Sequence, residues 1–143
     1  MKKALVLTNG LYQTSDAKTA HGLVRGSERF LIAGIIDNTQ TANKDAGELL
    51  DSTHRNIPVF ADLAAALSTI KDADTLIIGV ATVGGKLPVE MLVIIKEAIS
   101  KGLSIVNGLH DYLNEHADLV ELALKNNSIL IDIRKPKKRE DLH

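Results

Sequence analysis

The chain has 143 residues, 45% of them hydrophobic, with a formal net charge of −1 and no cysteine. The missing cysteines exclude disulfides, thiolate metal sites and cysteine nucleophiles, and the balanced charge gives no general attraction to nucleic acid or to an anionic membrane. No apolar run approaches the roughly 20 residues of a membrane span, so we expect a cytoplasmic domain without a membrane or nucleic-acid partner.

Apolar runs rich in β-branched residues alternate with helical segments, and we predict six strands at residues 3–8, 29–36, 58–60, 75–80, 104–107 and 128–133. Helices are predicted between them at residues 17–25, 46–50, 63–70, 88–101 and 115–125. Asp16 and Asp62 would cap the first and third helices, and Pro88 would be the first residue of the fourth. The short third strand opens with proline, which favours a sheet edge.

The strand runs themselves indicate how the sheet is built. Four of them are nearly continuous apolar stretches, which is typical of parallel strands whose two faces are both covered. Right-handed strand–helix–strand connections then favour an α/β fold: a doubly wound, mainly parallel, six-stranded Rossmann-like sheet with helices on both faces. Such sheets bind ligands beyond the carboxyl ends of the strands, where the strand order reverses. The sequence therefore predicts where a ligand would bind.

The composition changes at the end of the chain. Residues 134–139 read Arg-Lys-Pro-Lys-Lys-Arg, and a run so rich in cations resists burial. We therefore expect a Rossmann-like domain at residues 1–134 and a basic linker or tail at residues 135–143. A linker in this place suggests a second domain that is removed or absent.

The turn after the first predicted strand is the usual place for a phosphate. It matches neither G-x-G-x-x-G nor the P-loop spacing. Asn9 and Gly10 nevertheless leave the strand there, and Lys18 and Thr19 add a cation and a hydroxyl near a helix N-terminus. Asp37, which ends the second strand, stands where a ribose-binding carboxylate is often found. An ordinary loop, helix start and turn are the alternative interpretation of these residues.

The loop after the fourth predicted strand is a second candidate. Ala81 opens it, Gly84 and Gly85 would let the backbone approach a ligand, and Lys86 could meet an anion. A flexible turn before the next helix explains the same residues.

The loop after the fifth strand carries the best candidate for acid–base chemistry. His110 follows Gly108 on the ligand side of the sheet and is our candidate for a catalytic role, the alternative being an ordinary solvent-exposed loop histidine. Asp111 would either orient His110 or cap the following helix. Three further histidines are expected to be surface residues: His21, His54 and His116. No two histidines of the chain have metal-ligand spacing such as i, i+4, so we predict no metal site.

The predicted helix at residues 88–101 is apolar over more than the usual arc of a helix packed on one sheet face. Either neighbouring helices or a second chain must cover the surplus. We expect a homo-oligomer or a partner domain.

Several motifs occur together in a fixed order: residues 17–26, 34–37, 44–47, 57–60, 78–81, 84–88, 108–111 and 132–136. As a set they resemble the N-terminal Rossmann-like domain of a two-domain family long described as of unknown function. Some members of that family are named D-glutamate N-acetyltransferase. The resemblance covers essentially the whole chain.

This resemblance implies a C-terminal P-loop domain beginning soon after residues 134–136, and the chain has no Walker motif. It implies that the two-domain protein moves an acetyl group from acetyl-CoA to an amino acid's amine. It also implies that one cleft is lined by Lys18, Thr19, His21, Arg25, Asp37, Gly84, Gly85, His110 and Asp111.

Two functions follow as expectations. The first is a domain that binds a small anionic, nucleotide-like ligand of the NAD or CoA type. The alternative is a non-catalytic assembly module whose nucleotide crevice is vestigial. The sequence disfavours a third hypothesis, an NAD-dependent oxidoreductase, because the G-x-G-x-x-G motif and a substrate domain are both missing.

Overall fold

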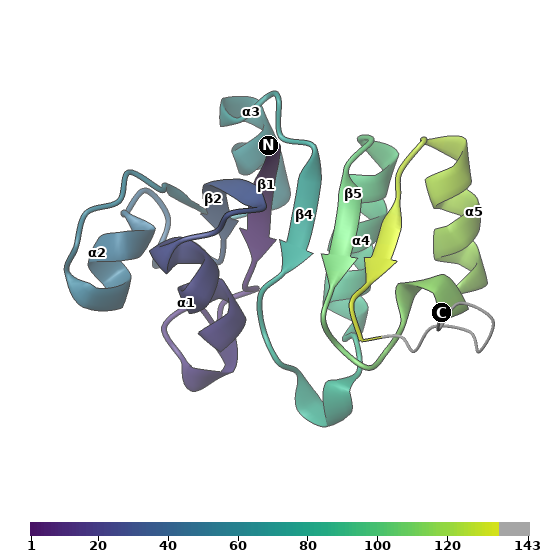
Figure 1. Ribbon diagram of the computed structural model, residues 1–143, viewed down its shortest axis with the longest axis horizontal. Helices are drawn as coiled ribbons and strands as arrows, with labels where there is room; N and C mark the ends of the chain where they lie inside the picture. Colours follow the sequence, from purple (N-terminus) through teal and green to yellow (C-terminus); the bar gives the residue numbers. More distant parts are fainter. Residues whose placement is uncertain (135–143) are drawn as a thin grey trace.

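The strands form where the apolar runs predict them. The computed structural model describes residues 1–134, and their strands are β1 (Lys2–Leu7), β2 (Phe30–Ile36), β3 (Val59–Phe60), β4 (Thr75–Ile78), β5 (Ser104–Asn107) and β6 (Leu130–Asp132). All five pairings between neighbouring strands are parallel, in the order β3-β2-β1-β4-β5-β6 (Figure 1). The predicted α/β fold is confirmed, and the strand order reverses between β1 and β4. The predicted basic tail, residues 135–143, lies outside the described residues.

Helices cover both faces of this sheet. The α-helices are α1 (Lys18–Arg25), α2 (Ala46–Asp51), α3 (Leu63–Thr69), α4 (Val89–Ser100) and α5 (Ala117–Lys125), with short 3₁₀ turns η1 (Ser15–Ala17), η2 (Val83–Gly85) and η3 (Leu113–Glu115). Figure 1 shows α1 in front of the sheet and α4 behind it, with α5 beside α4. No helix of the described part of the chain has both the length and the apolar character needed to cross a membrane.

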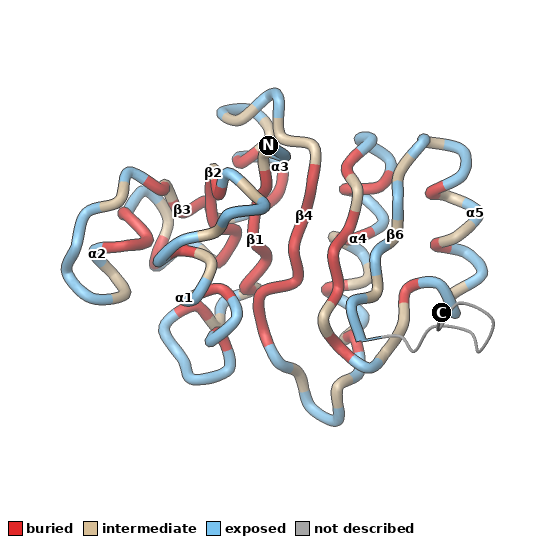
Figure 2. The backbone as a smooth tube through the Cα atoms, viewed as in Figure 1, coloured by how far each residue is buried: buried red, intermediate tan, exposed pale blue. Residues whose placement is uncertain are grey.

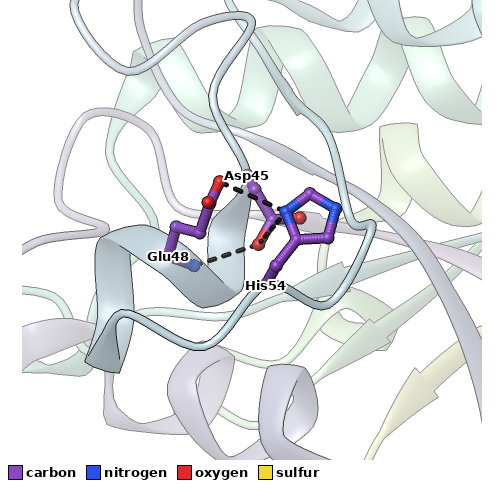
Figure 3. A group of neighbouring side chains, drawn as sticks. All are labelled: Asp45, Glu48 and His54. Atoms are coloured by element: carbon purple, nitrogen blue, oxygen red, sulfur yellow. Dashed lines mark hydrogen bonds and ion pairs between the residues drawn. The ribbon is translucent and has the colours of Figure 1, made fainter.

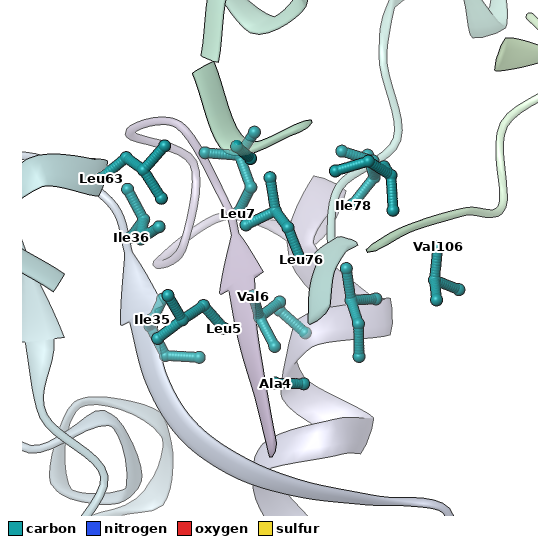
Figure 4. Packing of buried hydrophobic residues seen from close by; sticks show 14 of the residues in the cluster. Ala4, Leu5, Val6, Leu7, Ile35, Ile36, Leu63, Leu76, Ile78 and Val106 are labelled. Atoms are coloured by element: carbon teal, nitrogen blue, oxygen red, sulfur yellow. The ribbon is translucent and has the colours of Figure 1, made fainter. Parts of the chain in front are cut away.

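The core is mainly aliphatic and lies against the central strands (Figure 4). Leu5 and Leu7 of β1 and Ile35 of β2 have no exposed surface. Full burial of each such side chain contributes about 1.5–3 kcal/mol. Figure 2 shows that buried residues run along β1 and β4, the two strands on either side of the order reversal.

Two predicted helix starts differ from the structure. Thr14, not Asp16, caps the first helical segment: its hydroxyl accepts a bond from the Asp16 N–H, and η1 precedes α1. Pro88 is the N-cap of α4 and stands one residue before the helix. Asp62 caps α3 as predicted, accepting a 2.8 Å bond from the Ala65 N–H. The Asp16 prediction failed because two good capping residues stand two positions apart.

Tyr12 fastens the long loop after β1 to α2. Its side chain is 1% exposed, and its hydroxyl donates a 2.6 Å hydrogen bond to the Ala46 carbonyl. His21 Nε2 lies 2.6 Å from the Tyr12 carbonyl oxygen, so this nitrogen carries a proton and donates. The expectation that His21 is merely a surface residue is therefore wrong, because α1 turns its ring onto the loop.

Burial raises the pKa of Tyr12 to about 12. Because the folded-state pKa exceeds the usual value near 10, the neutral phenol stabilises the fold below pH 10, and this contribution is lost as the pH rises toward 12. We expect Tyr12→Phe to remove this alkaline loss while lowering stability at neutral pH by about 1 kcal/mol, the value of one hydrogen bond. Urea unfolding between pH 8 and 12 measures both effects, and Tyr112→Phe should keep the wild-type slope.

Candidate functional site

Among three cavities within residues 1–134, the largest lies at the carboxyl ends of β4 and β5 and has a volume of about 670 Å³. Four segments far apart in the sequence form its walls: the start of α1, and the residues that follow β4, β5 and β6. The lining residues are Ser15, Asp16, Lys18, Thr19, Ile77, Ile78, Val80, Ala81, Thr82, Gly85, Val106, Gly108, Leu109, His110, Ile133 and Arg134. This volume suits a drug-sized ligand.

The floor of the cavity is apolar. Ile77 pairs in register with Val106 on one side and with Val6 on the other, so all three side chains lie on one face of the sheet. Val6 belongs to the face that α1 covers, since a Cβ on Gly79 would lie 2.4 Å from Val6 and 3.0 Å from Ala20 of α1. The cavity therefore lies on the same face of the sheet as α1, beside that helix and over β4 and β5.

The rim of the cavity is polar and carries more positive than negative charge. Lys18 and Arg134 are cations from opposite ends of the described chain, and Asp16 is the one acid among the lining residues. Among residues 1–134, Lys18 takes part in none of the ion pairs. Arg134 is held at the rim because its Nε donates a 2.6 Å bond to the Gly108 carbonyl. His110 is exposed beside them and is available to a ligand.

Two backbone hydrogen bonds fix α1 to the end of β4. The Ala20 N–H donates to the Gly79 carbonyl at 3.1 Å, and the Ala81 N–H donates to the Asp16 carbonyl at 2.8 Å. These bonds span the point where the strand order reverses. They hold Lys18 and the β4 wall of the cavity in one rigid arrangement.

Asp37 has a different environment from the cavity residues. Its carboxylate accepts bonds from the Thr8 and Thr41 hydroxyls at 2.7 Å each, and from the N–H groups of Gly10 and Tyr12 at 2.9 and 3.0 Å. The side chain is 6% exposed. The carboxylate that was expected to bind a ribose therefore organises the loop after β1.

The predicted site residues are divided among three cavities rather than gathered in one. Six of them line the largest cavity: Lys18, Thr19, Ala81, Gly85, Gly108 and His110. Asn9 and Asp37 line a second cavity of about 290 Å³, and His21 lines a third of about 300 Å³ together with Lys18. Five others line none of these cavities: Gly10, Arg25, Gly84, Lys86 and Asp111.

Asp111 neither orients His110 nor caps a helix. One carboxylate oxygen accepts a 2.8 Å bond from the Leu87 N–H, and the other lies 2.8 Å from His116 Nε2. Burial works to raise the pKa of Asp111, but these hydrogen bonds outweigh burial and lower it. His116, expected at the surface, is partly buried because it packs against this carboxylate.

Sequence reasoning missed Arg134 and Ser15 as cavity residues. Arg134 was assigned to the basic run, although its position directly after the sixth strand places it at the same sheet edge as the other loops. That position was the available signal. Ser15 carried no pattern of its own.

Figure 3 shows a second cluster of polar side chains, formed by Asp45, Glu48 and His54. One ligand atom from each lies within 4.8 Å of the others, so the group has the composition of a cation site. Histidine spacing does not predict this cluster, because it contains a single histidine. Burial works to raise the pKa of Asp45, but bonds from the N–H groups of Arg55, Glu48 and Ile57 outweigh burial and lower it. Asp45 is thus accounted for as the cap of α2, and we assign no metal to it.

Comparisons with known proteins identify the family of this chain. A family model described as "Domain of unknown function (DUF1611_N) Rossmann-like domain" matches residues 39–136. The chain is 30% identical to a crystal structure of a DUF1611 family protein from Anabaena variabilis, with a TM-score of 0.83, over 96% of this chain and 38% of that one.

Curated relatives match over a shorter stretch. D-glutamate N-acetyltransferases from Pseudoalteromonas and Tritonibacter scottomollicae are 48% and 38% identical over 64 residues, which is 45% of this chain and 19% of each relative. Homoserine dehydrogenase from S. aureus, 13% identical with a TM-score of 0.54 over 92% of this chain and 33% of that one, shares the fold alone. The chain spans about a fifth of the length of the curated relatives that it matches. The predicted resemblance is confirmed, and the chain belongs to the DUF1611_N family of Rossmann-like domains.

Proposed function

We propose that this domain binds a small anionic ligand of the CoA type in the cavity at the ends of β4 and β5. The observation that carries the proposal is the arrangement of Lys18 and Arg134 around an apolar floor. Cations at the rim suit phosphate groups, and Ile77 and Val106 suit the uncharged arm of such a molecule. The engagement of Asp37 with the loop after β1 disfavours a dinucleotide such as NAD, whose ribose usually meets a free carboxylate there.

The names of the curated relatives support a reaction at this cavity. We infer transfer of an acetyl group from acetyl-CoA to the amine of an amino acid. The amine nitrogen attacks the thioester carbonyl, the new C–N bond forms, and the C–S bond breaks to release the thiol of CoA. His110, at the cavity rim, would take the proton that the amine loses and pass it to the departing sulfur, which leaves as the thiol.

A ligand screen tests the binding proposal. A ligand that binds only the folded state raises stability by RT ln(1 + [L]/Kd), about 2.7 kcal/mol at a hundredfold excess over Kd. We expect acetyl-CoA and CoA to raise the melting temperature of the 143-residue chain, and NAD to leave it unchanged. No shift with either CoA compound would contradict the proposal.

Lys18→Ala tests which residue meets the anion. We expect it to weaken CoA binding by about 1–3 kcal/mol, roughly 5- to 150-fold in Kd, because a charge-assisted hydrogen bond is lost. Isothermal titration measures the change. Lys101→Ala is the matched control, since Lys101 is an exposed lysine that follows α4 and lines none of the cavities. Equal affinities of the two variants would remove Lys18 from the site.

Exposed apolar side chains favour a second candidate, the assembly module. Val89 and Val93 of α4 are 75% and 59% exposed, and Ile131 of β6 is 37% exposed between two more exposed isoleucines. A homo-oligomer or a partner domain would cover such surfaces. An unchanged melting temperature with every ligand of the screen, together with a sedimentation coefficient that rises with protein concentration, would favour this function over ligand binding.

A further inference from the structure

The loop between β4 and α4, residues 79–88, forms one wall of the cavity and has few ties to the rest of the chain. Thr82 and Gly85 line the cavity, while Val83 at the tip is 96% exposed. Gly84 and Gly85 have φ angles of 64° and 70°, which glycine adopts without strain. The bonds of Gly85 N–H to Thr82 and of Lys86 N–H to Val83 stay within the loop.

Between Val80 and Leu87, two hydrogen bonds to described groups outside the loop fasten it, one near each end. At the first end, the Ala81 N–H donates to the Asp16 carbonyl. At the second end, the Leu87 N–H donates to Asp111 Oδ2 at 2.8 Å. Within residues 1–134, Asp111 is the only side chain from outside the loop that bonds to it. The second fastening therefore depends on one carboxylate.

Asp111 is itself held from two directions. His116 Nε2 lies 2.8 Å from Asp111 Oδ1, and Asn107 Nδ2 donates a 2.9 Å bond to the Asp111 carbonyl. Asn107 is fully buried and also donates to Asp132 at the end of β6. The Asn107 side chain thus links the backbone of Asp111 to the ends of β5 and β6.

The fastening lies directly beside the candidate acid–base residue. His110 precedes Asp111 in the chain, and a Cβ on Gly85 would lie 3.8 Å from the Cβ of His110. A shift of the loop away from Asp111 would therefore widen the cavity at His110. The lowered pKa of Asp111 keeps the carboxylate ionised at neutral pH, so it accepts both bonds there.

We propose that Asp111, oriented by His116, is a positioning residue that fastens the β4–α4 loop and so sets the width of the cavity at His110. This proposal rests on the proposed function only for its effect on the ligand. The fastening itself is measured without a ligand.

Asp111→Asn in the full 143-residue chain tests the proposal with two readouts. An amide cannot accept from both donors, so we expect hydrogen exchange at the Leu87 amide and at residues 82–86 to speed up about tenfold or more. We expect acetyl-CoA, used as the probe, to bind about tenfold more weakly. Asp118→Asn is the matched control, because Asp118 is an exposed α5 carboxylate paired with Lys96 at 2.8 Å.

Variants of His116 keep the proposal testable if Asp111→Asn fails to fold. His116→Ala should speed exchange in the same loop, and His116→Gln, which retains an N–H donor, should restore the wild-type rate. Unchanged exchange at Leu87 in Asp111→Asn and His116→Ala would overturn the fastening. Faster exchange with unchanged acetyl-CoA affinity would overturn the effect on the cavity. If the wild-type chain binds no acetyl-CoA, the proposed function fails, and exchange alone decides whether Asp111 fastens the loop.

Discussion

Replacing Asp37 by alanine is expected to lower the free energy of unfolding by about 3 kcal/mol. The substitution removes an acceptor that four donors share: the N–H groups of Gly10 and Tyr12, and the hydroxyls of Thr8 and Thr41, which can turn to the Ile36 carbonyl and to Asn38 Oδ1. Unmade hydrogen bonds at buried groups cost about 1–3 kcal/mol, and the exposed part of the loop recovers some of this through water. Urea unfolding at pH 7 measures the loss as a shift of the midpoint at constant slope.

Asp62→Ala is the control for this substitution. Asp62 is an exposed aspartate that accepts one bond, from the Ala65 N–H, so its loss should cost about 1 kcal/mol, as for an ordinary N-cap. If Asp37→Ala were no more destabilising than Asp62→Ala, Asp37 would not organise the loop. Its carboxylate would then again be a candidate for a ribose.

The sheet could be predicted from the sequence because burial on both faces leaves a direct pattern. The apolar runs of β1, β2 and β4 have almost no polar interruption, and these strands form the middle of the sheet. The short run at Val59 and Phe60 opens after a proline and is the edge strand β3, as predicted. Periodicity also gives the helices, but it does not fix the first residue of a helix, which depends on competing caps such as Thr14 and Asp16.

The candidate site could be predicted only to the level of which loops meet. Because all strands are parallel, the loops after β1, β4 and β5 must reach the same edge of the sheet, and Lys18, Ala81 and His110 do line one cavity. What each carboxylate bonds to depends on loop conformation, which leaves no periodic pattern. Asp37 and Asp111 were therefore expected to serve a ligand or a neighbour, whereas both bind N–H groups of distant loops.

Asp132 organises a loop in the other half of the sheet, as Asp37 does in the first half. It ends β6 as Asp37 follows β2, and it accepts bonds from the N–H groups of Leu113 and Asn114 and from the Asn107 side chain. Burial works to raise the pKa of Asp132, but these bonds outweigh burial and lower it. In both halves, an aspartate at the end of one strand thus orders the loop that follows the neighbouring strand. Between them, the ends of β4 and β5 are left open as the cavity.

Gly79→Ala is expected to lower the free energy of unfolding by about 2 kcal/mol. The new Cβ would lie 2.4 Å from Val6 Cγ1 and 3.0 Å from the Cβ of Ala20, so α1 would have to move away from the sheet. That movement would also stretch the bond from the Ala20 N–H to the Gly79 carbonyl, which holds Lys18 at the cavity. Urea unfolding measures the stability, and the proposal for the site further predicts weaker CoA binding by this variant.

Gly22→Ala separates this steric effect from the general effect of replacing glycine. Gly22 lies within α1, and a Cβ there would meet nothing within 4 Å. Alanine is the better helix former, so the same substitution should here raise stability by about 0.5–1 kcal/mol. Opposite signs at two glycines, one in α1 and one beside it, would establish that contact between α1 and the β1–β4 junction positions the cavity wall. If Gly79→Ala were neutral, α1 could shift freely, and the two backbone bonds would not fix Lys18.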